Sequence, residues 1–161
     1  MIRSYTPADR SAVLAINEAN VPEVGPLDDA KLDLFLDEAE SFLVVEVDEV
    51  VVGIMIVLGP GGTYASPNYR WFSERYDQFV YVDRIALAET ARGRGWGPAL
   101  YARFEALALE QGVMTMAAEV NTVPLNERSL RFHGIAGFEE VGRCQPYGGD
   151  EEVAMLVKTL G

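Results

Sequence analysis

The chain has 161 residues, a formal net charge of −12, one cysteine and one histidine. This charge argues against a nucleic-acid partner, since phosphate backbones are bound by basic surfaces. One Cys and one His cannot form a Cys/His zinc site, so we expect no metal. No stretch approaches the ~18 apolar residues that span a bilayer, and the apolar core of a secretory signal is missing. We therefore expect one cytoplasmic domain, residues 1–161, with no membrane partner.

The amino-terminal residues predict a short strand followed by a helix. Residues 2–5 are expected to form the strand. Thr6 is the expected N-cap of a helix that runs to about residue 19, with Pro7 in its first turn and Asp9 near the positive end of its dipole.

A second helix and a hairpin are expected next. Either residue of the pair Asp28-Asp29 caps a helix whose apolar residues recur at helical spacing. Residues 41–47 and 50–58 are rich in β-branched side chains and are separated by Asp48-Glu49. This spacing predicts two antiparallel strands joined by a two-residue turn.

Residues 59–78 form a long connection with many aromatic side chains and a possible short helix near its end. Their rings could line a pocket for an amine, because a ring face attracts a cation. They could equally pin the connection to the core or cover a dimer interface. The aromatic residues of this connection are Tyr64, Tyr69, Trp71, Phe72 and Tyr76.

The second half of the chain predicts a parallel strand–helix–strand step followed by an antiparallel pair. A helix should join the first two strands, and another helix should precede the last two. The expected strands are 79–87, 113–120, 138–141 and 153–159, and the expected helices are 98–111 and 126–133. The fold class is therefore α+β: a mixed, mostly antiparallel central sheet of about seven strands with a central parallel step, flanked by about four helices.

The stretch Arg92-Gly-Arg-Gly-Trp-Gly97 joins the strand 79–87 to the next helix. Glycines let the backbone approach a ligand closely, and the first N–H groups of a helix attract anions. Residues 84–103 also carry a local charge of +3 within an acidic chain. A phosphate site is therefore expected here. It is neither a nucleoside-triphosphate loop, since no Gly-Lys occurs, nor a dinucleotide fingerprint, since Pro98 and Leu100 stand where glycine is needed.

The stretch resembles the GNAT superfamily of N-acetyltransferases, whose hallmark Gln/Arg-x-x-Gly-x-Gly/Ala matches Arg92-x-x-Gly95-x-Gly97 after the strand residues 82–87. Downstream, Asn126, residues 129–133 and Gly137-Phe138 match a second part of the family pattern. The resemblance covers nearly the whole chain and implies the GNAT-like (acyl-CoA N-acyltransferase) fold.

The resemblance implies that the protein binds acetyl-CoA. The backbone of the glycine loop would hold the pyrophosphate, with the side chains of Arg92 and Arg94 near the phosphates, although both could also be solvated surface charges. The pantetheine arm would pair with the strand before the loop, and Asn126 would contact the arm near the thioester. The residues implied in cofactor binding are Ile85, Ala86, Leu87, Arg92, Gly93, Arg94, Gly95, Trp96, Gly97, Pro98, Asn126 and Ser129.

Transfer of an acetyl group from a thioester to an amine needs an amine that has lost its proton and a polarised thioester carbonyl. The leaving thiolate can also take up a proton from a general acid. The resemblance implies the Ile85 N–H as the oxyanion donor and His133, in the position of a family tyrosine, as the general acid. Asp83 and Glu119 are the candidate general bases. Asp83 could instead form an ion pair with a neighbouring arginine, Glu119 could be a solvated strand end, and water could be the base.

The expected function is acetyl-CoA-dependent transfer of an acetyl group to a primary amine of a small molecule, by direct attack in a ternary complex. Two alternatives remain open. One is a non-catalytic CoA-binding regulatory module, and the other is an acetyltransferase acting on a protein N-terminus or lysine. Similar proteins are commonly homodimers, so a homodimer is expected.

Overall fold

The fold is known from a computed structural model, which describes all 161 residues. Its strands are β1 (Ile2–Ser4), β2 (Ala39–Val47), β3 (Val50–Leu58), β4 (Val80–Leu87), β5 (Thr115–Val123), β6 (Glu139–Cys144) and β7 (Glu152–Thr159). Its α-helices are α1 (Arg10–Glu18), α2 (Asp29–Glu38), α3 (Pro67–Ser73), α4 (Trp96–Glu110) and α5 (Glu127–Ile135). Two short 3₁₀ helices, η1 (Pro7–Asp9) and η2 (Glu89–Ala91), complete the elements.

The strands form one seven-stranded sheet in the order β1-β2-β3-β4-β5-β7-β6, and β4 pairs with β5 in parallel. The predicted α+β fold, with its mixed sheet and parallel step, is confirmed. The number of α-helices is five rather than about four, because the long connection contains α3. Ser66 starts this helix by accepting a hydrogen bond from the Tyr69 N–H at 3.4 Å, and Pro67 occupies its first turn.

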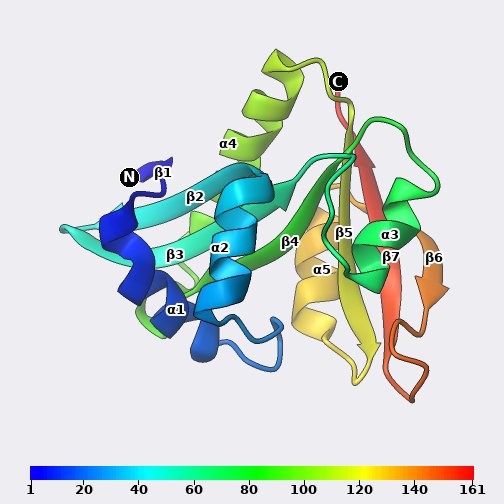
Figure 1. The fold of residues 1–161 in the computed structure, drawn as a ribbon, viewed down its shortest axis with the longest axis horizontal. Helices are drawn as coiled ribbons and strands as arrows, with labels where there is room; N and C mark the ends of the chain where they lie inside the picture. The colour runs from blue at the N-terminus through cyan, green and yellow to red at the C-terminus, as the bar shows by residue number, and fades with distance from the viewer. The chain divides into compact units, whose positions relative to one another are not determined.

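The first of two compact units comprises residues 1–58 and 82–107. In it, β1 pairs with β2 and β2 pairs with β3, both antiparallel, and α1 and α2 lie on one face of β2 and β3 (Figure 1). Asp48 and Glu49 join β2 to β3 with φ of +49° and +65°. Two positive values are typical of a type I′ turn, which matches the twist of a hairpin, so the predicted two-residue turn is confirmed.

The apolar faces of α1 and α2 contribute to the core of this unit, together with buried residues of β2 and β3. Val13, Leu32 and Phe35 are fully buried. Asp28, one of the two residues predicted as the cap, starts α2 by accepting a hydrogen bond from the Lys31 N–H at 2.8 Å. The helix expected from Thr6 is divided into η1 and α1.

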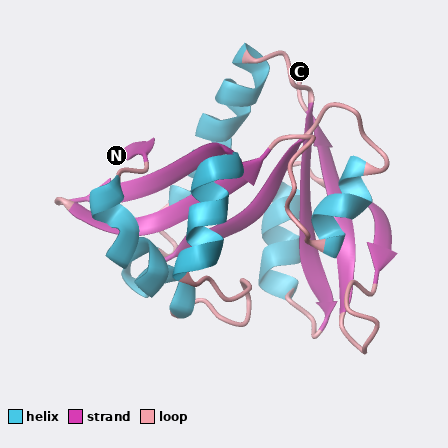
Figure 2. Cartoon of the chain, in the orientation of Figure 1, coloured by secondary structure: helices cyan, strands magenta, loops and turns pink.

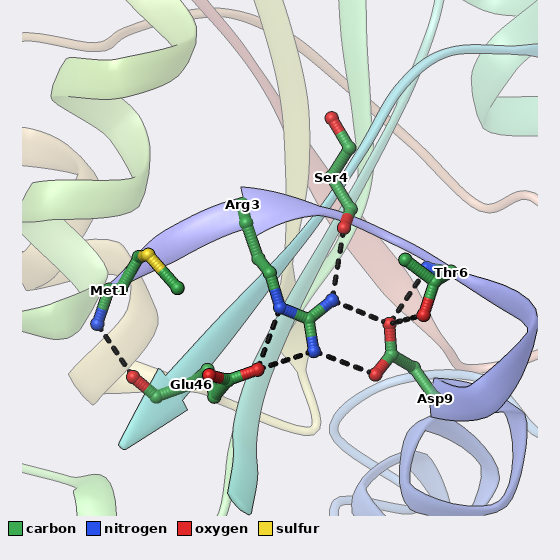
Figure 3. A network of polar contacts seen from close by, with 6 residues as sticks. All are labelled: Met1, Arg3, Ser4, Thr6, Asp9 and Glu46. Carbon is green, nitrogen blue, oxygen red and sulfur yellow. Dashed lines mark hydrogen bonds and ion pairs between the residues drawn. The ribbon is translucent and has the colours of Figure 1, made fainter. Parts of the chain in front are cut away.

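A network of polar contacts ties the amino terminus to β2 and η1 (Figure 3). The Arg3 guanidinium donates to both carboxylate oxygens of Asp9, at 2.8 and 2.9 Å, and to Glu46 at 2.7 Å. Asp9 also accepts the Thr6 N–H at 2.7 Å, which closes the first turn of η1. Since the Asp9 side chain is only 6% exposed, this pair is less screened by water than an ordinary surface ion pair.

Replacing Asp9 by Asn is expected to remove an acid-sensitive part of the stability. The hydrogen bond from Arg3 lowers the pKa of Asp9 from 3.8 to about 2. Asp9 is therefore protonated at a lower pH in the folded state than in the unfolded state. Its contribution to the unfolding free energy is complete above pH 3.8 and disappears as pH falls through about 2. Urea unfolding of both proteins should show a gap of about 1.5–3 kcal/mol in the unfolding free energy near neutral pH, which closes in acid.

Asp33→Asn is the matched control for this prediction. Asp33 also pairs with an arginine, Arg10, at 2.8 Å, but its side chain is 64% exposed. This variant should change the unfolding free energy by less than about 1 kcal/mol. Equal effects of the two variants would contradict the role given to Asp9.

The second compact unit comprises residues 59–81 and 108–161. In it, β5 and β7 pair antiparallel, as do β6 and β7, and α5 packs against β5 (Figure 2). The antiparallel pairing of the last two strands, predicted from the sequence, is confirmed. The parallel register of β4 with β5 consists of Val80 with Met116 and Tyr81 with Ala117.

The aromatic rings of the long connection belong largely to the interior. Tyr69 and Phe72 are 2% and 0% exposed. The Tyr69 hydroxyl donates to the Gly59 carbonyl at 2.6 Å and accepts the Gly62 N–H at 3.0 Å, which fixes the start of the connection. Trp71 packs on the backbone of Gly142 in β6, where a Cβ would lie 2.8 Å from its ring. These contacts support the expectation that the rings pin the connection to the core.

Candidate functional site

The glycine loop has the conformation that only glycine adopts easily. Gly93 and Gly95 have φ of +71° and +82°, and a Cβ on either would meet no atom within 4 Å. Backbone conformation, not close packing, therefore requires glycine at these positions. Both residues and Arg94 between them are exposed, so the loop presents its backbone to solvent.

The helix α4 begins at Trp96, two residues before the predicted start at Pro98. Ala99 N–H donates to the Gly95 carbonyl at 3.1 Å, which makes this the first intrahelical bond. The N–H groups of Trp96 and Gly97 precede it and have no acceptor within the helix. Pro98 contributes no N–H, so its part in the loop is to set φ for the first turn.

The last peptide of β4 shows which way its backbone faces. Ala88 N–H donates to the Val52 carbonyl of β3 at 2.8 Å. The carbonyl of the same trans peptide, that of Leu87, therefore points away from β3. Since a strand alternates its hydrogen-bonding direction, the N–H and C=O groups of Ile85 point the same way as those of Leu87. An extended chain of amides could pair with this side of β4, as predicted for the pantetheine arm.

Arg92 is half-buried and held in place, whereas Arg94 is exposed. The Arg92 Nη2 donates to the Asn20 Oδ1 at 2.8 Å. Asn20 follows α1 and was not among the predicted site residues. Arg92 is therefore not simply a solvated surface charge.

Asp83 forms the ion pair that was one of its two expected roles. Its Oδ2 lies 2.8 Å from the Arg84 Nε, and the two side chains are 4% and 3% exposed. Arg84 also donates to the Asn17 Oδ1 at 2.7 Å and to the Gly25 carbonyl at 3.0 Å. Removing either partner of a buried ion pair leaves an uncompensated charge, so this carboxylate is committed to Arg84, which favours a structural role for Asp83 over proton transfer.

Glu119 lies in β5 at the centre of a polar cluster in the second unit. Its Oε1 accepts the Tyr81 hydroxyl at 2.8 Å and the Asn68 Nδ2 at 3.2 Å. Tyr81 and Asn68 are buried, so these donors orient the carboxylate firmly. Glu119 is therefore not a solvated strand end. Asn68 was missed at the sequence level, because nothing in the residues around it points to a partner so far along the chain.

Cys144 lies beside this cluster. Its Sγ is 3.8 Å from the Asn68 Oδ1 and from the Met155 Sδ. Burial raises the pKa of the Cys144 thiol, with the charge of Glu119 adding to the shift. The thiol therefore stays protonated near neutral pH, which does not suit a nucleophile.

His133 is buried in α5. Its Nδ1 lies 2.7 Å from the Ser129 carbonyl, and its ring meets the Phe138 ring edge-on at 5.2 Å. Burial lowers the pKa of His133 below 6.5, while the bond to Ser129 opposes this shift. The ring is therefore largely neutral at pH 7. Because its Nδ1 donates to a carbonyl, the neutral ring carries its lone pair on Nε2.

Asn126 and Ser129 start the helix α5. The Asn126 Oδ1 accepts the Ser129 N–H at 3.2 Å, so Asn126 is the N-cap. The amide nitrogen of Asn126 is not used by this cap. A contact of either residue with the cofactor stays a prediction.

The sequence profile of the Acetyltransferase (GNAT) family matches residues 11–138. The chain belongs to this family. No curated protein matches the sequence. Members of the family are N-acetyltransferases that use acetyl-CoA, so the enzyme class that the resemblance implied is confirmed.

Solved structures similar to this acetyltransferase cover nearly all of it. Ard1 from Thermoplasma volcanium is 25% identical, with coverage of 100% of this chain and 97% of that chain and a TM-score of 0.77. The ribosomal-protein-alanine N-acetyltransferase from Brucella melitensis is 26% identical, with 99% coverage of both chains and a TM-score of 0.74. Naa20 from Chaetomium thermophilum, solved with a bisubstrate analogue, is 17% identical, covers 99% of this chain and 86% of that chain, has a TM-score of 0.76 and supports the fold alone.

The predicted site residues of the acetyltransferase fall into two groups. The first unit holds Asp83, the β4 residues 85–87 and the loop residues 92–98. The second unit holds Glu119, Asn126, Ser129 and His133. No helix of the chain combines the length and the apolar character that a membrane span requires.

His133→Gln is expected to make the stability less dependent on pH. Because His133 is the only histidine, it is the only imidazole that titrates in this chain. Its folded pKa lies below 6.5, so the unfolded state takes up the proton first and stability falls as pH decreases below 6.5. The unfolding free energy of the wild type should drop more than that of the variant between about pH 7.5 and about pH 5.5. Equal drops would contradict the buried, neutral imidazole.

Proposed function

We propose that this acetyltransferase transfers the acetyl group of acetyl-CoA to a primary amine of a small molecule, by direct attack in a ternary complex. The glycine loop carries the proposal. Gly93 and Gly95 hold positive φ in an exposed loop, and the loop runs directly into the start of α4. Backbone N–H groups at such a helix start suit the pyrophosphate of CoA.

The residues present fit this cofactor on chemical grounds. Gly93 and Gly95 have no Cβ, and the space where one would lie is open, so a ligand can approach the backbone closely. Arg92 and Arg94 add positive charge, and the N–H and C=O groups of Ile85 face away from β3, where an arm containing amides can pair with them. The Ile85 N–H is the proposed donor to the developing oxyanion.

Acetyl-CoA supplies an activated thioester when bound. Glu119 removes the proton that the attacking amine must lose, directly or through a water molecule. The hydrogen bonds from Tyr81 and Asn68 hold its Oε1 in one orientation, and this supports its assignment over Asp83, whose carboxylate is engaged with Arg84.

His133 is the proposed proton donor to the leaving thiolate. With Nδ1 donating to Ser129, the proton must leave from Nε2 of the protonated ring. Since burial lowers the pKa of His133, this form becomes scarcer as pH rises. At alkaline pH water takes over this role.

The acceptor is proposed to be cationic in solution, in keeping with the net charge of −12. A protein N-terminus is the second candidate, because two of the similar structures are Ard1 and a ribosomal-protein-alanine N-acetyltransferase. A homodimer and a cytoplasmic location remain proposals as well.

Calorimetry with CoA, followed by a thiol-release assay, tests the proposal. The assay uses acetyl-CoA with a panel of small amines and of peptides that differ in their first residue. Binding of CoA together with turnover on a small amine supports it. Turnover on peptides alone would move the acceptor to a protein N-terminus, and no binding of CoA would refute the proposal.

A further inference from the structure

The side chain of Asn20 links three elements of the first unit. Asn20 lies two residues after α1 and is 7% exposed. Its Nδ2 donates to the Ile16 carbonyl of α1 at 2.8 Å and to the Leu87 carbonyl of β4 at 3.2 Å. Its Oδ1 accepts the Arg92 Nη2 at 2.8 Å. Its Nδ2 therefore serves both α1 and β4, and its Oδ1 holds the arginine of the glycine loop.

The chemistry of these three contacts requires a carboxamide. Two carbonyl oxygens need two donors on one atom, and the guanidinium needs an acceptor on the other. A carboxylate would face two carbonyl oxygens without a proton to donate. The contact with Ile16 only closes the last turn of α1, but the other two reach the side of β4 and the loop that the proposed function assigns to the cofactor.

We propose that Asn20 is a positioning residue for the CoA diphosphate, acting through Arg92. This inference rests on the proposed function. A free arginine side chain must give up its rotational freedom when it meets a phosphate, whereas Arg92 is already held on one side by Asn20 and keeps its remaining donors for the ligand. The bond from Asn20 to Leu87 fixes this guanidinium relative to the strand on which the arm of the cofactor would lie.

The test is a double-mutant cycle on CoA binding, measured by calorimetry with the full chain. Asn20→Ala and Arg92→Ala should each weaken CoA binding about tenfold. The double variant should bind no more weakly than Arg92→Ala, because Asn20 has nothing left to position. A residue that only supports the fold would not give this dependence.

Arg94→Ala is the matched control. Arg94 lies in the same loop and carries the same charge, but it is Arg92 that Asn20 holds. In the double variant of Asn20→Ala and Arg94→Ala, the loss of CoA affinity should therefore equal the product of the two single fold-losses. Wild-type affinity in Asn20→Ala, or multiplying losses for Asn20→Ala and Arg92→Ala, would overturn the inference while the proposed function stands.

Two further results separate the remaining cases. Thermal unfolding shows whether Asn20→Ala folds. If it does not fold, the affinity of Arg92→Ala for CoA decides the test. An affinity equal to that of the wild type would overturn the inference. If the wild type itself does not bind CoA, the proposed function fails and the inference fails with it.

Discussion

Glu119→Gln is expected to lower turnover by about 100-fold or more and to leave CoA affinity unchanged. Glutamine keeps the shape of the side chain and can still accept the Tyr81 hydroxyl, which is 2.8 Å from the carboxylate in the wild type. It cannot accept a proton from the amine. Steady-state kinetics with the acceptor identified by the panel, together with calorimetry for CoA, would measure the two quantities separately.

Glu140→Gln is the control for this result. Glu140 is an exposed carboxylate on β6 that pairs with Arg143 at 2.7 Å. Its substitution removes the same charge and should leave turnover within about twofold of the wild type. Turnover of Glu119→Gln close to that of the wild type would exclude Glu119 as the base and leave the amine to lose its proton to water.

Gly95→Ala should weaken CoA binding by about tenfold or more. Its φ of +82° disfavours any residue with a Cβ by about 1–2 kcal/mol, so the loop would relax to another conformation and turn its N–H groups away from the phosphates. Calorimetry with CoA measures the loss directly.

Gly61→Ala provides a control with the same backbone strain. Gly61 also has φ of +82° and no atom within 4 Å of a Cβ, but it lies in the connection before α3. Its substitution should lower thermal stability and leave the CoA dissociation constant unchanged. If both variants bound CoA equally well, the loop would not be the phosphate site.

Local chemistry accounts for the parts of the fold that the sequence predicted. The turn at Asp48-Glu49 and the cap at Asp28 each depend on residues a few positions apart, so their patterns are visible in the chain. The start of α4 was placed too late because Pro98 is a familiar first-turn residue, whereas the helix begins at Trp96. The helix α3 was placed only loosely, since its Ser66-Pro67 start lies in a run rich in turn residues.

The same distinction applies to the site. The glycine loop is contiguous, so its need for glycine could be predicted from neighbouring residues, whereas its role in binding the cofactor stays a prediction. Asp83 and Glu119 were recognised as carboxylates in strands, but only tertiary contacts separate their roles. Asn68 is 51 residues from Glu119, and Asn20 is 72 residues from Arg92. No pattern of neighbouring residues carries such pairings.

The proline in the first turn of α4 has a consequence for the working conditions of the enzyme. A helix that begins Trp96-Gly97-Pro98 offers one fewer amide to a bound anion than a helix with any other residue at its third position. A larger share of the attraction must then come from the guanidinium groups of Arg92 and Arg94, the second of which is exposed to solvent. Dissolved ions weaken such attraction over about 8–10 Å at physiological ionic strength, so retention of the cofactor in this protein should depend on ionic strength more than in relatives with a complete set of amides.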